Sequence, residues 1–132
     1  MPKKWCRLFP GMPWQVSEAR RFVAGLLADE GKAVVEDAEL VVGELASNAV
    51  RHTRSGWYRG WFLVIVGFSD DTVRIEVIDQ GSDDEPLVRS VRSPVEEGGR
   101  GLLLIAACAE NWGVKDRPGG RCIWADLARV SG

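Results

Sequence analysis

Two polar side chains four residues apart, Glu44 and Asn48, lie in an otherwise apolar stretch of the sequence. Residues at this spacing lie on one face of a helix, one turn apart, so their side chains can reach the same small volume. A carboxylate can act there as a general base, and an amide oxygen can bind a hard metal ion. Each residue also has a structural explanation, because most helix carboxylates are solvated and a helical asparagine can bond to a neighbouring loop.

Two later segments could supply the rest of a nucleotide site. Asp79-Gln80-Gly81 is expected to end a strand, where the carboxylate could accept a hydrogen bond from an exocyclic amine and the glycine would permit close approach. Gly98-Gly99-Arg100-Gly101 directly precedes an apolar run, so it is expected to open a helix whose free amide groups favour an anion. Taken singly, the first segment is a common turn and the second a flexible hinge.

Apolar periodicity predicts the elements that must position these groups. A first helix is expected to be capped by Ser17 and to stop near Gly31, and a second to run from about residue 34 to 52. Two hairpins and a short helix should follow, with strands at 61–68, 73–79, 112–115 and 122–128 and the helix at 101–111. This order predicts an α+β fold, a two-layer sandwich with the helices on one face of a mostly antiparallel mixed sheet.

The remaining segments are expected to be irregular. Residues 1–16 contain Pro10, Gly11 and Pro13 and are predicted to be an irregular or extended lead-in. Residues 82–98 lack periodicity and are predicted to be a loop. The sequence has six tryptophans, and those of the irregular segments, Trp5, Trp14 and Trp57, are expected to pack in the core in preference to meeting a partner.

Composition limits the class of protein. The 132 residues suit a single domain over 1–132, and the 17 basic and 19 acidic residues leave a formal charge of −2 with no basic cluster for nucleic acid. Three cysteines without metal-ligand spacing favour a reducing, cytoplasmic setting. No stretch reaches the roughly 20 apolar residues that a membrane span requires.

Together the three motifs resemble those of the histidine-kinase-like ATPase superfamily, which has the Bergerat fold. Within it, the segment from Glu44 to His52 is similar to the first motif of the anti-sigma factor serine/threonine kinases, and Gly99-Arg100-Gly101-Leu102 is similar to their last motif. The resemblance extends over nearly the whole chain, from the Ser17 helix to Ala128. It implies a kinase that uses ATP and Mg²⁺.

The resemblance also implies a role for each matching residue. Glu44 would be the general base, and Asn48 would hold Mg²⁺ at the ATP phosphates beneath a lid of residues 82–98. Arg20 would contact the partner protein. The implied ATP contacts are Asn48, His52, Asp79, Gly81, Gly99, Arg100, Gly101 and Leu102.

The partners implied are an anti-sigma factor antagonist, which would be phosphorylated, and a sigma factor, which would be sequestered in the regulation of transcription. Similar proteins form dimers, which makes a homodimer one option. A non-catalytic, nucleotide-responsive binding module and an interaction domain without nucleotide are the alternatives. Two departures from the family pattern favour the nucleotide-responsive module. They are the acidic residues at 83–85 of the lid, and Arg121, where related sequences often have a threonine that helps hold adenine.

Overall fold

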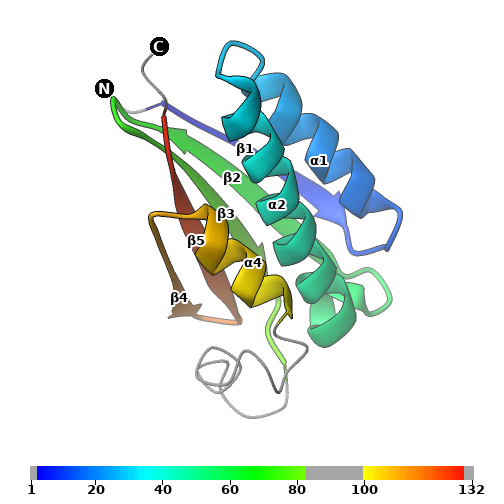
Figure 1. Ribbon diagram of the computed structural model, residues 1–132. Helices are drawn as coiled ribbons and strands as arrows, with labels where there is room; N and C mark the ends of the chain where they lie inside the picture. The colour runs from blue at the N-terminus through cyan, green and yellow to red at the C-terminus, as the bar shows by residue number, and fades with distance from the viewer. Residues whose placement is uncertain (1–2, 83–99, 130–132) are drawn as a thin grey trace.

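The computed structural model describes residues 3–82 and 100–129, with side chains from residue 103 onward in the second range. In this part of the chain, five strands form one sheet in the order β1-β2-β3-β5-β4, and three α-helices cover one of its faces (Figure 1). In chain order the elements are β1 (Lys3–Pro10), α1 (Gln15–Leu26), α2 (Lys32–His52), the 3-10 turn η1 (Arg54–Gly56), β2 (Trp61–Phe68), β3 (Thr72–Asp79), α4 (Arg100–Cys108), β4 (Asn111–Arg117) and β5 (Gly120–Ala128).

All four strand pairings are antiparallel, and together with the helical layer they confirm the predicted α+β sandwich. The predicted hairpins and the second helix agree with β2–β3, β4–β5 and α2 to within a few residues. No helix in the described ranges is both long and apolar enough to cross a membrane.

The core lies between the helices and the sheet. Helix α2 buries a stripe that includes Val41, Val42 and Leu45, because these positions recur at helical spacing. Strands β2 and β3 bury alternate residues toward this stripe, as a sheet covered on one face must. The strand residues that belong to this hydrophobic core are Phe9, Phe62, Val64, Val66, Val73, Ile75, Val77, Ile123, Ala125 and Leu127.

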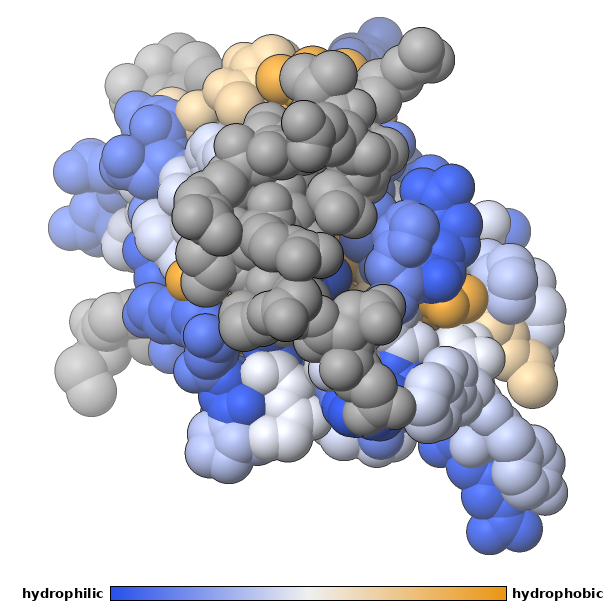
Figure 2. Space-filling view, turned by 90° about the horizontal axis from the view of Figure 1, so that it is seen from below, coloured by the Kyte–Doolittle hydropathy of each residue, from blue (hydrophilic) through white to orange (hydrophobic). Residues whose placement is uncertain are grey.

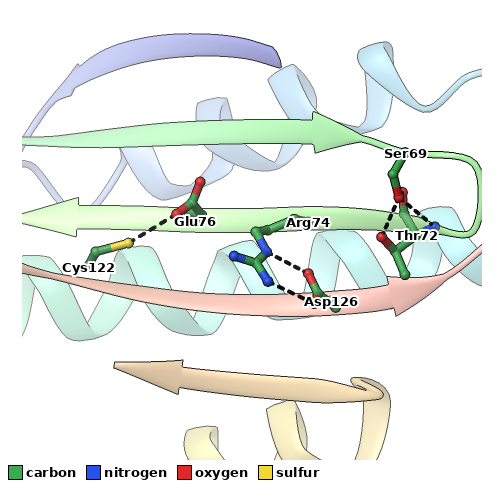
Figure 3. A network of polar contacts seen from close by, with 6 residues as sticks. All are labelled: Ser69, Thr72, Arg74, Glu76, Cys122 and Asp126. Atoms are coloured by element: carbon green, nitrogen blue, oxygen red, sulfur yellow. Dashed lines mark hydrogen bonds and ion pairs between the residues drawn. The ribbon is translucent and has the colours of Figure 1, made fainter. Parts of the chain in front are cut away.

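The face of the sheet away from the helices carries polar contacts (Figure 3). Arg74 of β3 donates two hydrogen bonds, of 2.7 and 3.0 Å, to the carboxylate of Asp126 opposite it on β5. Its guanidinium also stacks over Trp124, 4.2 Å from the ring centroid. On the same face the thiol of Cys122 lies 3.4 Å from Oε1 of Glu76.

The prediction of an irregular or extended lead-in over residues 1–16 missed a paired strand. Lys3–Pro10 forms edge strand β1 by pairing with β2, and α1 begins at Gln15 with Trp14, not Ser17, at its N-cap position. The strand escaped prediction because only Phe9 in it is buried, so the alternation of polar and apolar residues that marks a half-buried strand is missing.

The expectation that three tryptophans pack in the core is also wrong. Trp5, Trp14 and Trp57 expose 51%, 62% and 59% of their surface. The core is already closed by aliphatic residues and by the stacked rings of Phe9 and Phe62. These large rings are therefore displayed on the surface.

Cys122 should make stability depend on alkaline pH. Burial first, and the nearby Glu76 carboxylate second, raise the pKa of this thiol from 9.0 to about 12. Because the unfolded chain loses this proton at a lower pH than the folded chain, the free energy of unfolding should fall as pH rises from about 9 toward 12. We expect Cys122→Ser to lose less stability than the wild type between pH 8 and pH 10.5, measured by urea denaturation.

The matched control is Cys6→Ser, which changes an exposed thiol and should keep the wild-type pH dependence. Equal pH dependence of Cys122→Ser and the wild type would contradict the prediction.

Candidate functional site

One flank of α2 faces α4. Glu44 and Asn48 follow Asp37 by 7 and 11 positions. At about 100° per residue, this places both within roughly 20° of a line that runs along the helix through Asp37. Burial first, and the nearby carboxylate of Asp37 second, raise the pKa of the thiol of Cys108 on α4, so Asp37 lies on the side of α2 that faces α4. In Figure 1, α4 starts beside the C-terminal part of α2. The flank therefore presents Glu44 and Asn48 toward the first turns of α4.

Glu44 and Asn48 are both half-buried. Neither side chain makes a hydrogen bond or an ion pair with any residue that the structure describes. No buried side-chain polar atom of the described residues lacks a partner. The carboxylate and the amide therefore keep their polar atoms accessible from outside. Two accessible, unpaired oxygen-bearing groups one turn apart are suited to a bound ligand.

Hydrogen bonds join the segment after α2 to the end of β3. The backbone N–H of Arg54 donates to the carbonyl of Gly81 at 2.7 Å, and the N–H of Gln80 donates to Oγ of Ser55 at 3.0 Å. Thr53 prepares this contact, because its hydroxyl accepts from the N–H of Ser55 and so turns the chain. These hydrogen bonds were not predicted from the sequence, although the Thr-x-Ser pattern at residues 53–55 was a signal for the turn that makes them. His52, the last residue of α2, is exposed beside it.

Asp79 is held in a buried ion pair. Its Oδ2 accepts a 2.7 Å hydrogen bond from Nε of Arg121, and its Oδ1 accepts one of 2.7 Å from the N–H of Gly81. Asp79 and Arg121 lie directly opposite each other on β3 and β5, on the helix-covered face. Their side chains expose only 3% and 5% of their surface.

A corner of glycines closes over this ion pair. Gly81 has a φ of +75°, which a residue with a side chain rarely adopts. A Cβ on Gly120 would lie 1.9 Å from the carbonyl oxygen of Asp79. The turn between β4 and β5 thus packs directly on the end of β3. In the view from below, the part of the surface that Figure 2 colours is mainly hydrophilic with separate hydrophobic spots.

The glycine motif is placed only in part. Arg100, Gly101 and Leu102 form the first turn of α4, and their side chains are outside what the structure describes. Gly99, the predicted lid at residues 82–98 beyond Ser82 and its acidic residues also lie outside the described ranges. The predicted phosphate contacts at these positions stay predictions.

Arg20 lies on α1 and crosses the backbone of α2. A Cβ built on Gly43 would be 2.5 Å from Nε of Arg20, so the guanidinium covers this glycine. The side chain is half-buried between the two helices. Gly43 precedes Glu44 but lies on a different face of α2, so Arg20 is not brought to the Glu44 flank by this contact.

The donor set suits a magnesium ion only when a ligand shares it. The described residues contain no group of three or more His, Cys, Asp or Glu side chains that could hold a metal alone. One amide oxygen and one nearby carboxylate are hard donors of the kind Mg²⁺ accepts when substrate phosphates complete its shell. The amide oxygen of Asn48 therefore fits Mg²⁺ bound together with a nucleotide, and the Glu44 carboxylate lies one turn away.

An antiparallel sheet covered on one face by three helices, with an acid and an amide beside the start of α4, defines an α+β domain with one polar end. A family model described as the histidine kinase-like ATPase domain matches residues 9–127. The chain belongs to the histidine kinase-like ATPase family, and the predicted resemblance to this superfamily is confirmed.

Among solved structures, the chain is similar to the crystal structure of the RsbU and RsbW domains of Rv1364c from Mycobacterium tuberculosis. The TM-score is 0.69 and the sequence identity 16%, over 96% of this chain and 32% of that one. The chain thus spans about a third of the length of that protein chain, and the likeness supports the fold. No curated protein matches the sequence.

The glycine corner predicts that Gly120→Ala destabilises the domain by about 3 kcal/mol, because the new Cβ must displace the backbone of Asp79. Gly67→Ala is the matched control: it adds the same methyl to a strand, but its nearest neighbour would be 3.7 Å away. We expect the control to stay within about 0.5 kcal/mol of the wild type in urea denaturation. Equal losses in the two variants would contradict the close packing of this turn.

Proposed function

We propose that this chain is an ATP-binding regulator of the anti-sigma factor serine/threonine kinase type. The observation that carries the proposal is the unpaired, half-buried pair of Glu44 and Asn48 on the flank of α2 that faces the start of α4. Family membership and the sequence motifs around these two residues support it. Its partners would be an anti-sigma antagonist and a sigma factor, met in the cytoplasm, and a homodimer is part of the same proposal.

In this function the amide oxygen of Asn48 would hold Mg²⁺ at the phosphates of ATP. Bound Mg²⁺ would neutralise negative charge on the phosphates. The free N–H groups at the start of α4 add positive potential on the same side, because the helix dipole has its positive end there. The further nucleotide contacts proposed are His52, Gly99, Arg100, Gly101 and Leu102, with Asp79 and Gly81 at the base end, where Arg121 already pairs with the Asp79 carboxylate.

Glu44 then acts on the second substrate, a serine hydroxyl of the antagonist protein. Its carboxylate takes the hydroxyl proton while the serine oxygen forms a bond to the γ-phosphorus, and the bond from that phosphorus to the bridging oxygen of ADP breaks. ADP leaves with the electron pair of the broken bond. Arg20, at the α1–α2 surface, is proposed to contact the partner.

A second candidate is a nucleotide-responsive binding module that performs no transfer. The ion pair of Asp79 with Arg121 favours it, because the carboxylate proposed to read adenine is already engaged. Such a module would bind its partner differently with and without nucleotide. Its discriminating feature is that Glu44 would be dispensable.

Binding is tested by thermal unfolding with and without MgATP. A ligand present at 100 times its dissociation constant stabilises the folded state by about 2.7 kcal/mol, so the wild-type Tm should rise by several degrees. We expect Asn48→Ala to lose most of this rise, because Mg²⁺ loses its amide ligand. Ser47→Ala, one position away on another face of α2, is the control that should keep it.

A Tm unchanged by millimolar MgATP would refute nucleotide binding by this chain and leave a plain interaction domain. A full shift in Asn48→Ala would refute the role of the amide.

Transfer is tested with radiolabelled ATP, Mg²⁺ and a purified antagonist protein of the sulfate-transporter-and-antagonist domain class. Glu44→Gln should slow phosphoserine formation by about 10²–10⁴-fold, because the base is lost, while keeping the MgATP-induced rise in Tm. Glu36→Gln, which alters an exposed carboxylate of the same helix that pairs with Lys32, should react at the wild-type rate. An unaffected rate in Glu44→Gln would exclude Glu44 as the base.

A further inference from the structure

Both carboxylate oxygens of Asp79 already accept a hydrogen bond. Oδ2 is held by the charged Nε–H of Arg121 and Oδ1 by the N–H of Gly81, each at 2.7 Å. Both side chains are almost fully enclosed. A nucleotide base that used this carboxylate would have to compete with a guanidinium that the fold has already placed there.

The competition is unequal. The bond from Arg121 joins two opposite charges, whereas the exocyclic amine of adenine is a neutral donor and adds no such attraction to the carboxylate. Displacing Arg121 would also strand its charge in a buried position, which is costly. The ion pair is therefore expected to persist when a nucleotide binds.

Arg121 itself cannot take over the recognition of adenine. A guanidinium carries only N–H donors, and the amino group of adenine is also a donor. The Arg121 guanidinium thus adds no interaction that would favour adenine over another base.

We propose that Arg121 is a specificity-determining residue: by occupying Asp79 it removes selection for adenine, so that the chain binds nucleoside triphosphates through their phosphates. This inference rests on the proposed function, since it concerns the base end of the same site. The substrate class becomes nucleoside triphosphates with Mg²⁺ in place of ATP alone.

A second ion pair between the same strands supplies a matched control. Arg74 of β3 and Asp126 of β5 also lie opposite each other and share two hydrogen bonds, but on the face away from the helices (Figure 3). Arg74→Thr and Arg121→Thr therefore remove the same kind of interaction from the same pair of strands. Only the second change touches the base end of the site.

The experiment measures dissociation constants of MgATP, MgGTP and magnesium tripolyphosphate, a probe without a base, by isothermal titration calorimetry. The wild type and Arg74→Thr should bind ATP and GTP within about threefold of each other, and tripolyphosphate should also bind. Arg121→Thr should prefer ATP by about tenfold or more, because Asp79 becomes able to accept the adenine amine.

A wild-type preference for ATP above tenfold, or an unchanged ratio in Arg121→Thr, would overturn this inference and leave the proposed function standing. Absence of binding by all three probes to every variant would overturn both. If Arg121→Thr fails to fold, Arg121→Gln takes its place: this neutral donor still reaches Asp79 but competes less, so the preference for ATP must rise, and an unchanged ratio refutes the proposal.

Discussion

Helix α2 can bury only one side against the sheet, and the candidate site depends on which side that is. Its apolar stripe fixes the rotation of the helix about its own axis. Glu44 and Asn48 fall on the adjoining flank, where α4 packs and where they stay half-exposed. A helix rotated by one residue would bury these groups without partners, which is energetically unfavourable.

The C-terminal end of α2 fixes the second half of the site. Backbone hydrogen bonds from Arg54 and Gln80 join the turn after α2 to the end of β3, and the turn between β4 and β5 packs on the same point. Three segments distant in sequence thus meet around Asp79. Their meeting gives the site two unlike ends: an unpaired acid and amide on α2, and a carboxylate already satisfied by Arg121.

Much of the fold could be predicted, because α2, β2 and β3 each bury a regular set of positions that leaves a period in the sequence. Strand β1 could not, since an edge strand with one buried residue leaves no such period. The exposed tryptophans show the same limit: residue type indicates a preference for burial, but the space left by other side chains decides whether it is met.

The sequence by itself determined that Glu44 and Asn48 share one face of a helix and that Asp79 ends a strand, because both follow from local spacing along the chain. Only the tertiary structure decided what these groups meet. Asp79 and Arg121 are 42 residues apart and become neighbours through the register of β3 with β5. Strand register depends on the packing of whole faces against the core. The Asp79 carboxylate, which local spacing suggested as a ligand contact, therefore pairs with Arg121, a partner that only the folded sheet brings close.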